Sequence, residues 1–200
     1  MLVAKYSCEQ LQEIFRVDRD GEGDRFINSP YANIENSNRR LLWHGSRTTN
    51  YGGILSQGLR IAPPEAPVTG YMFGKGVYFA DMSSKSANYC WSHCSNNLGI
   101  LMLCDVELGD PMLKLKDAEY NAGEHAKKEG KLATLGMGRT VPAGWKDAGC
   151  VHPDLKGVMM PDTTSNPGNA TEDGLYLQYN EYIVYDVAQI RIKYLLLVQM

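Results

Sequence analysis

The carboxy-terminal part of the chain contains two runs that are dense in β-forming residues and are separated by a very short connection. The first run covers residues 175–187 and the second residues 190–198, and both are rich in Tyr, Ile, Val and Leu. Such side chains suit the pleated, half-buried surface of a sheet, so the two runs predict neighbouring strands. Any fold of this chain must therefore be built around a sheet that includes its carboxy-terminal end.

Several shorter elements precede this pair. Strands are expected at residues 11–17, 41–43, 77–79 and 99–108, a short helix at residues 48–57 that Gly58 ends, and a second helix from an N-cap at Asp81 to about Cys94. Strands outnumber helices, and no regular alternation of strand and helix is present. The sequence therefore predicts an α+β fold with a largely antiparallel sheet.

Two stretches are expected to contribute little to the core. Residues 62–76 contain three prolines and three glycines and predict an irregular surface loop. Residues 110–169 are rich in Gly, Pro and charged residues, with one possible short helix near residues 117–127. A length of 200 residues with 44% hydrophobic side chains suits one domain rather than two.

Charge and cysteine content exclude several classes of protein. The chain has 20 basic and 23 acidic residues and a formal charge of -3, so direct nucleic-acid binding is not expected. It has neither a secretory signal nor an apolar run of the roughly 18 residues that a membrane span needs, so no membrane association is expected. Five irregularly spaced cysteines do not suggest a disulfide framework and point to a reducing compartment.

The glycine-rich motifs of the common nucleotide-binding folds are missing. Gly21-Glu22-Gly23 is not followed by a third glycine, and Gly74-Lys75-Gly76 precedes a strand instead of a helix. The run of residues 70–76 also fails as a P-loop, because its glycines are too close and no Ser or Thr follows Lys75. If the chain binds a dinucleotide, it uses another architecture.

Three short segments place a polar residue at a strand edge among apolar or aromatic neighbours. They are residues 41–47 with His44, residues 74–81 with Tyr78, and residues 179–182 with Glu181. Each residue alone has a structural explanation: a core histidine, a packing aromatic and an exposed edge-strand carboxylate. Only their combination favours a functional site.

The combination resembles the catalytic domain of the poly(ADP-ribose) polymerases, in particular the DNA-damage-responsive members. The similar segments are residues 44–50, 53–60, 62–90 and 179–196, whereas residues 92–172 look freely diverged. The resemblance implies an ADP-ribosyltransferase fold with a split, largely antiparallel sheet and short flanking helices. It also implies a nuclear (otherwise cytosolic), monomeric enzyme that uses NAD⁺ as substrate, and acceptor proteins and poly(ADP-ribose) as further partners.

By this resemblance, His44, Tyr78 and Glu181 form a His-Tyr-Glu catalytic triad. Cleavage of the bond between nicotinamide and ribose creates an oxocarbenium-like sugar, which a carboxylate such as Glu181 stabilises. Glu181 would also orient or deprotonate an acceptor hydroxyl. His44 would hold the adenosine-side ribose, and Tyr78 would line the pocket of the nicotinamide ribose.

The resemblance extends to the other residues expected to bind NAD⁺. The hydroxyl of Ser86 and the backbone of Gly45 would hold the nicotinamide carboxamide, and Tyr89 would stack on its ring. Lys85, Ser86 and Tyr89 are spaced so that they share one helix face. The remaining expected NAD⁺ contacts are Ser46, Asn50, Gly53, Arg60, Tyr71, Phe79 and Ala80; for Arg60, an ordinary exposed arginine is the alternative.

Other hypotheses remain open beside this one. Cys90, His93, Cys94, Cys150 and His152 could in principle form a zinc site, but their spacing is unusual for zinc, and we expect no metal. A mono-ADP-ribosyltransferase and a silent ADP-ribose or NAD⁺ sensor are the rival functions. The domain interpretation is one catalytic domain over residues 1–200, without the regulatory helical domain that precedes it in relatives, so activity is expected to be independent of DNA.

Overall fold

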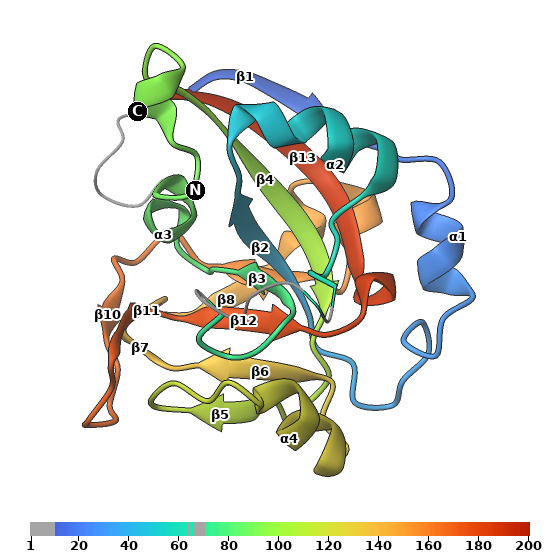
Figure 1. Ribbon diagram of the computed structural model, residues 1–200, viewed down its shortest axis with the longest axis vertical. Coiled ribbons are helices and arrows are strands. Elements are labelled where there is room, and N and C mark those ends of the chain that lie inside the picture. The colour runs from blue at the N-terminus through green and yellow to red at the C-terminus, as the bar shows by residue number, and fades with distance from the viewer. Residues whose placement is uncertain (1–10, 64, 66–70) are drawn as a thin grey trace.

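The two longest strands, β4 (Leu98–Glu107) and β13 (Ile190–Gln199), lie antiparallel beside each other in the interior of a six-stranded sheet in the computed structural model (Figure 1). The structure describes residues 11–63, 65 and 71–200. The order of the sheet is β1-β13-β4-β2-β9-β8, with β1 at Leu11–Arg16, β2 at Arg39–Gly45, β8 at Trp145–Asp147 and β9 at Met159–Pro161. The β-rich carboxy-terminal run thus occupies an interior position of the sheet.

A second sheet of four strands lies in the lower part of Figure 1. Its order is β3-β12-β6-β5, with β3 at Val77–Phe79, β5 at Leu113–Leu115, β6 at Ala133–Gly136 and β12 at Glu181–Val184. A bridge between Trp43 and Ala80 joins the ends of β2 and β3, and therefore joins the two sheets. A small third sheet has the order β10-β7-β11, at Gly168–Asn169, Gly138–Val141 and Leu177–Tyr179.

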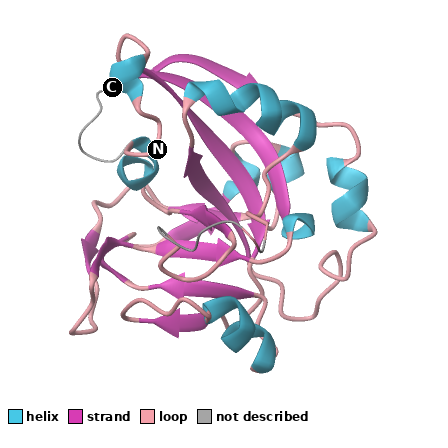
Figure 2. Cartoon of the chain, viewed as in Figure 1, coloured by secondary structure: helices cyan, strands magenta, loops and turns pink. Residues whose placement is uncertain are grey.

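The main hydrophobic core lies between the six-stranded and the four-stranded sheet. Leu42, Met102 and Ile192 contribute from the first sheet, and Phe79 and Tyr182 from the second, all with 2% or less of their surface exposed. Strands predominate over helices (Figure 2), and most strand pairs are antiparallel. The predicted α+β class with a largely antiparallel, split sheet is confirmed.

Short helices pack against the sheets. They are α1 (Glu22–Ile27), α2 (Tyr51–Gln57) after a 3-10 turn at Thr48–Asn50, α3 (Ser83–Ala87) and α4 (Ala122–Lys128), with further 3-10 turns at Ser92–Cys94, Ala148–Cys150, Pro153–Leu155 and Val187–Gln189. Of these, α1 packs on β13, α3 on β2 and β4, and α4 on β5 and β6. Gly58 ends α2 with a φ of 81°, as the sequence predicted. Within the described residues, no helix has the length and apolar character needed to cross a membrane.

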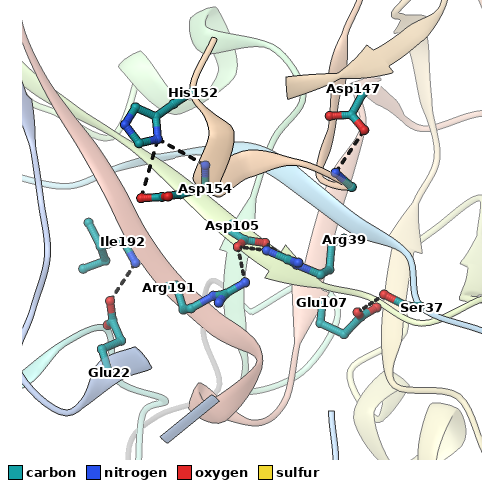
Figure 3. A network of polar contacts seen from close by, with 11 residues as sticks. Glu22, Ser37, Arg39, Asp105, Glu107, Asp147, His152, Asp154, Arg191 and Ile192 are labelled. Atoms are coloured by element: carbon teal, nitrogen blue, oxygen red, sulfur yellow. Dashed lines mark hydrogen bonds and ion pairs between the residues drawn. The ribbon is translucent and has the colours of Figure 1, made fainter. Parts of the chain in front are cut away.

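Buried charges connect the strands of the six-stranded sheet (Figure 3). Asp105 on β4 accepts hydrogen bonds from Arg39 on β2 and Arg191 on β13, both at 2.5 Å. Glu22 on α1 accepts a hydrogen bond from the backbone N–H of Ile192 at 2.8 Å. Asp105 and Glu22 are 2% and 4% exposed, so these contacts are shielded from water. They link β4 to β2 and β13, and α1 to β13.

Two element predictions are wrong in their extent. The helix expected from Asp81 to Cys94 is α-helical only over Ser83–Ala87, and Met82, not Asp81, is its N-cap. The carboxylate of Asp81 is instead turned into the interior, and Trp91 adopts a φ of 52°, which ends helical geometry. The single strand expected over residues 175–187 is divided at Asn180 into β11 and β12, which belong to different sheets.

The middle of the chain contributes more to the core than expected. Residues 110–169 supply β5 to β10, and Ala122, Ala126, Ala133, Ala148 and Leu155 are at most 1% exposed. Small side chains in short elements leave no long apolar run in the sequence, which explains the wrong prediction. The helix expected near residues 117–127 is present as α4, a few residues later. Of the predicted loop at residues 62–76, residues 64 and 66–70 lie outside the described residues, and the rest forms no helix or strand.

Candidate active site

Two adjoining depressions share the side chains of His44 and Tyr78. The smaller depression is lined by His44, Gly45, Tyr78, Phe79, Ala80, Lys85, Ser86, Tyr89 and Glu181. The larger one includes His44, Ser46, Asn50, Gly53, Arg60, Tyr71 and Tyr78 among its lining residues. Every residue predicted from the sequence as catalytic or NAD⁺-binding therefore lines one of two connected hollows.

The junction of the two sheets brings the three triad candidates together. His44 lies near the end of β2, Tyr78 is the middle residue of β3, and Glu181 is the first residue of β12. β3 pairs with β12, and its following residue Ala80 bridges to Trp43 of β2. Segments far apart in the sequence thus deliver the three side chains to one place.

His44 is held as a neutral imidazole. Its Nδ1 lies 2.8 Å from the backbone carbonyl oxygen of Tyr78, and this contact requires Nδ1 to carry the proton and donate. Burial lowers the pKa of His44, and the hydrogen bond to Tyr78 offsets only part of this effect. Nε2 is then left as an acceptor for a ligand hydroxyl.

The hydroxyl of Tyr78 is engaged in two hydrogen bonds with the protein backbone. The hydroxyl donates to the carbonyl oxygen of Gly74 at 2.7 Å and accepts from the backbone N–H of Phe73 at 3.0 Å. Burial raises the pKa of Tyr78 well above its usual range, so the phenol stays protonated. The ring, 6.3 Å from that of Tyr71, forms a wall between the two depressions and does not supply a general base.

Glu181 forms an ion pair with Lys85 of α3. Only 6% of the surface of Glu181 is exposed, and both residues line the smaller depression. This pair puts a carboxylate and its cation on the wall of a confined pocket, where charge interactions are stronger than in bulk water. The sequence predicted both residues as part of the site but not their contact.

Gly45 allows α3 to approach β2 closely. A Cβ atom built on Gly45 would lie 1.9 Å from the backbone oxygen of Ser86, which no side chain can tolerate. Ser86 is 4% exposed, and the backbone N–H of Tyr89 donates to its carbonyl oxygen at 3.1 Å. Tyr89 lies beyond the end of α3, so the predicted shared helix face is not regular, but all three residues still meet at one pocket.

The larger depression has a polar character at its far end. Asn50 donates a hydrogen bond to the hydroxyl of Ser46 at 2.9 Å, and Gly53 leaves the surface of α2 open because nothing lies within 4 Å of where its Cβ would be. Arg60 is exposed, and within the described part of the chain no carboxylate pairs with it. An arginine placed this way is available to bind phosphate.

The residues considered for zinc do not form a cluster. Among the described residues, no group of three or more His, Cys, Asp or Glu side chains could hold a metal ion. Cys90 is buried, where its thiol packs among apolar neighbours and burial raises its pKa to about 11, whereas Cys94 and Cys150 are exposed.

A buried group behind Glu181 was missed in the sequence. Asn180 and Tyr182 each donate a hydrogen bond to Asp81, and all three residues lie outside the lining of both depressions. The available signal was that Asn180 and Tyr182 flank Glu181 at alternate strand positions and so point away from the pocket. Asp81 was assigned to a helix N-cap instead.

The model of the poly(ADP-ribose) polymerase catalytic domain matches residues 3–200 of the chain. The chain belongs to this family. It is 51% identical over 189 residues to poly [ADP-ribose] polymerase 1 of Gallus gallus, covering 92% of this chain and 17% of that protein. It is 50% identical over 190 residues to poly [ADP-ribose] polymerase 2 of Arabidopsis thaliana, covering 95% of this chain and 28% of that protein.

A third relative gives the same result. Poly [ADP-ribose] polymerase 2 of Homo sapiens is 47% identical over 190 residues, covering 94% of this chain and 30% of that protein. The chain thus spans less than a third of the length of each of these relatives. Family membership is therefore established for the catalytic domain.

Proposed function

We propose that the chain is a poly(ADP-ribosyl)transferase that cleaves NAD⁺, releases nicotinamide and transfers ADP-ribose to acceptor proteins and to growing ADP-ribose chains. The observation that carries this proposal is the convergence of His44, Tyr78 and Glu181 on two connected depressions in a member of the poly(ADP-ribose) polymerase catalytic-domain family. The names of the relatives, poly [ADP-ribose] polymerases, support the same activity.

The two depressions suit the two halves of NAD⁺. The smaller one takes the nicotinamide, with Tyr89 stacked on its ring and the Ser86 hydroxyl and Gly45 backbone on its carboxamide. The larger one takes the adenosine half, with His44 and Ser46 on the ribose and Arg60 on the phosphates. The nicotinamide ribose then lies at the shared boundary, beside His44 and Tyr78.

Glu181 carries the chemistry in this arrangement. As nicotinamide departs with the electron pair of its glycosidic bond, positive charge develops on the ribose, and the Glu181 carboxylate stabilises that charge. An acceptor hydroxyl then forms the new glycosidic bond and loses its proton, with Glu181 orienting it or receiving the proton. His44 and Tyr78 contribute by positioning the substrate.

The remaining partners and the location of the protein follow from the family. Acceptor proteins and poly(ADP-ribose) are the proposed macromolecular substrates, the nucleus is the proposed location, and the domain is proposed to act as a monomer without binding DNA directly. Mono-ADP-ribosyl transfer is the second candidate. The glutamate at the triad position argues against it, because family members that replace that residue with an apolar one transfer single units; product length decides between the two, since some members with the complete triad elongate poorly.

The decisive experiment measures nicotinamide release and product length. The purified chain is incubated with NAD⁺ and an acceptor protein, nicotinamide is quantified by chromatography, and products are resolved on a denaturing gel. We expect stoichiometric nicotinamide and long polymers. Glu181→Gln keeps the size of the side chain but loses its charge and basicity, so it should abolish elongation while NAD⁺ still binds. Single ADP-ribose units from the unmodified chain would favour the mono-transferase, and no nicotinamide release would refute both.

A further inference from the structure

Asp81 is a fully buried carboxylate that the proposed reaction does not use. It lies between β3 and α3, has 0% of its surface exposed, and lines neither depression. One oxygen, Oδ2, accepts a hydrogen bond from the amide Nδ2 of Asn180 at 2.8 Å and another from the hydroxyl of Tyr182 at 3.0 Å. A buried carboxylate is costly unless its contacts repay its desolvation, so two donors on one oxygen call for an explanation.

The two donors are the residues on either side of Glu181. Tyr182 follows Glu181 in β12, where successive side chains point to opposite faces, and Asn180 directly precedes the strand. Both side chains reach Asp81 in the interior, whereas Glu181 lines the pocket. We propose that Asp81 is a positioning residue for Glu181: by holding both neighbouring side chains with one oxygen, it sets the direction in which the Glu181 carboxylate points. The inference rests on the proposed function, because it concerns the residue that carries the reaction.

Asp81 and its two hydrogen-bond donors, Asn180 and Tyr182, are called the clamp below. Each of the two donors also makes a second hydrogen bond. Asn180 accepts a hydrogen bond from the backbone N–H of Gly138 at 2.8 Å through Oδ1, which ties it to β7. The Tyr182 hydroxyl accepts from Arg40 of β2 at 3.0 Å, and the Arg40 guanidinium lies 4.0 Å above the centre of the Trp145 ring. Rotation of β12 about its own axis would break contacts on both sides, so the clamp resists the motion that would turn Glu181 out of the pocket.

Asp81 also links Glu181 to its cationic partner. Lys85, which forms the ion pair with Glu181, lies four residues after Asp81, within the short helix α3 that follows. One short segment of backbone therefore makes two contacts with β12. Asp81 accepts the hydrogen bond from Tyr182 in the interior, and Lys85 forms the ion pair with Glu181 at the pocket. The distance between Glu181 and Lys85 is thus set by both contacts.

The surroundings of Asp81 offset only part of the cost of burying its charge. Burial raises its pKa to about 6, while the hydrogen bonds from Asn180 and Tyr182 and the charge of Arg40 act in the opposite direction. The carboxyl is therefore ionised at pH 8, where both donors bind it most strongly.

The test is an interaction between two substitutions. Asp81→Asn keeps the size of the side chain but removes its charge. We expect it to lower kcat for nicotinamide release by about tenfold to a hundredfold, with KM for NAD⁺ changed less than about threefold, because it misdirects Glu181 without touching the binding pocket. In the Glu181→Gln background, Asp81→Asn should lower the residual kcat by less than about twofold, since the group that Asp81 positions is already disabled. Equal losses in both backgrounds would overturn the proposal.

A second variant keeps the test informative if Asp81→Asn does not fold. Tyr182→Phe removes only one hydroxyl of the clamp and should lower kcat several-fold. The matched control is Tyr31→Phe, which also loses a hydrogen bond from a phenol to an aspartate, at 2.9 Å to Asp186, beyond the end of β12 and outside the lining of both depressions. Equal kcat in Tyr182→Phe and the control would contradict the clamp. Failure of the unmodified chain to release nicotinamide would instead refute the proposed function, so the two failures are distinguishable.

Discussion

The Nδ1 atom of His44 lies 2.8 Å from the backbone carbonyl oxygen of Tyr78, so a hydrogen bond joins two residues of the predicted triad directly. The bond fixes the orientation of the imidazole and the position of its proton. β2 and β3 are therefore connected at the site by a side chain as well as by the bridge between Trp43 and Ala80. The position of His44 relative to the pocket depends on this pair of contacts.

The first prediction follows from the ionisation of His44. Because burial lowers its pKa, the imidazole stays neutral when the pH falls to its usual value near 6.5, and the unfolded chain takes up that proton first. This histidine should therefore reduce the free energy of unfolding only below about pH 6.5. In NMR spectra, the ring signals of His44 should remain constant from pH 9 to pH 6.5. A midpoint for His44 at or above 6.5 would contradict the neutral assignment.

A second prediction concerns Gly45. A Cβ atom at this position would collide with the backbone of Ser86, so Gly45→Ala should push α3 away from β2 and open the smaller depression. We expect a loss of about 1–3 kcal/mol in the free energy of unfolding, as for other overpacked sites, and a loss of affinity for nicotinamide mimics. Gly52→Ala is the matched control. Nothing lies within 4 Å of a Cβ there, and alanine should stabilise the exposed helix α2 by about 0.5–1 kcal/mol. Equal changes in the free energy of unfolding for Gly45→Ala and Gly52→Ala, measured by denaturant titration, would refute the predicted clash with Ser86.

These sites also show which features the sequence could predict. The segments around His44, Tyr78 and Glu181 were recognisable because each is a local pattern, a polar residue at the edge of an apolar strand, and because their combination resembles a family. Asp81 was not, since its partner Asn180 lies 99 residues away. A local capping rule assigned Asp81 to a helix end, but hydrogen bonds to a distant strand determine its actual orientation.

The division between β11 and β12 has a similar cause. Residues 175–187 are uniformly β-prone, so propensity alone predicts one strand. The chain changes sheets at Asn180 because the side chain of this residue is held by Asp81 and Gly138, which lie in different parts of the fold. Tertiary contacts therefore decide where a strand ends when propensity does not.

A third prediction tests the nicotinamide pocket. Tyr89 lines the smaller depression yet keeps 54% of its surface exposed, so its ring forms an open face on which a flat ligand can stack. Benzamide-type mimics should compete with NAD⁺, and Tyr89→Ala should weaken them by about 1–3 kcal/mol through lost stacking and a wetter pocket. Calorimetric titration of the variant checks this. Unchanged affinity would place the nicotinamide elsewhere.

The fourth prediction concerns the buried charges of Figure 3. Asp105 is the shared partner of Arg39 and Arg191, whose side chains are 21% and 15% exposed. Asp105→Ala leaves two largely buried cations without their carboxylate and should reduce the free energy of unfolding by about 3–5 kcal/mol. The control is Asp154→Ala, which removes the exposed ion pair with Arg16 and should cost less than about 1 kcal/mol. Similar costs for the two variants in urea titrations would contradict the importance of burial.

The last prediction uses the titration of Asp81. Burial raises its pKa from the ordinary 3.8 to about 6, so the folded protein binds the proton more tightly than the unfolded chain does. Between these two values the folded state holds the extra proton, and the contribution of Asp81 to the free energy of unfolding therefore falls as the pH rises from about 4 to about 6. This change of the pKa from 3.8 to about 6 corresponds to a loss on the order of 3 kcal/mol in the free energy of unfolding.

The amide introduced by Asp81→Asn cannot ionise, so this variant lacks the contribution of Asp81 to the pH dependence of the free energy of unfolding. The free energy of unfolding of the wild type minus that of the variant should fall by about 3 kcal/mol between pH 4 and pH 7 and stay constant above pH 7, as measured by urea titration at each pH. The groups that face Asp81 are Arg40, Asn180 and Tyr182, and none of them changes charge in this window, because an arginine stays protonated and the pKa of Tyr182 is raised far above its usual range. Other carboxyls titrate in both proteins and cancel in the difference. Parallel curves for the two proteins would mean that Asp81 ionises normally, whereas a falling difference would identify it as the buried acid behind Glu181.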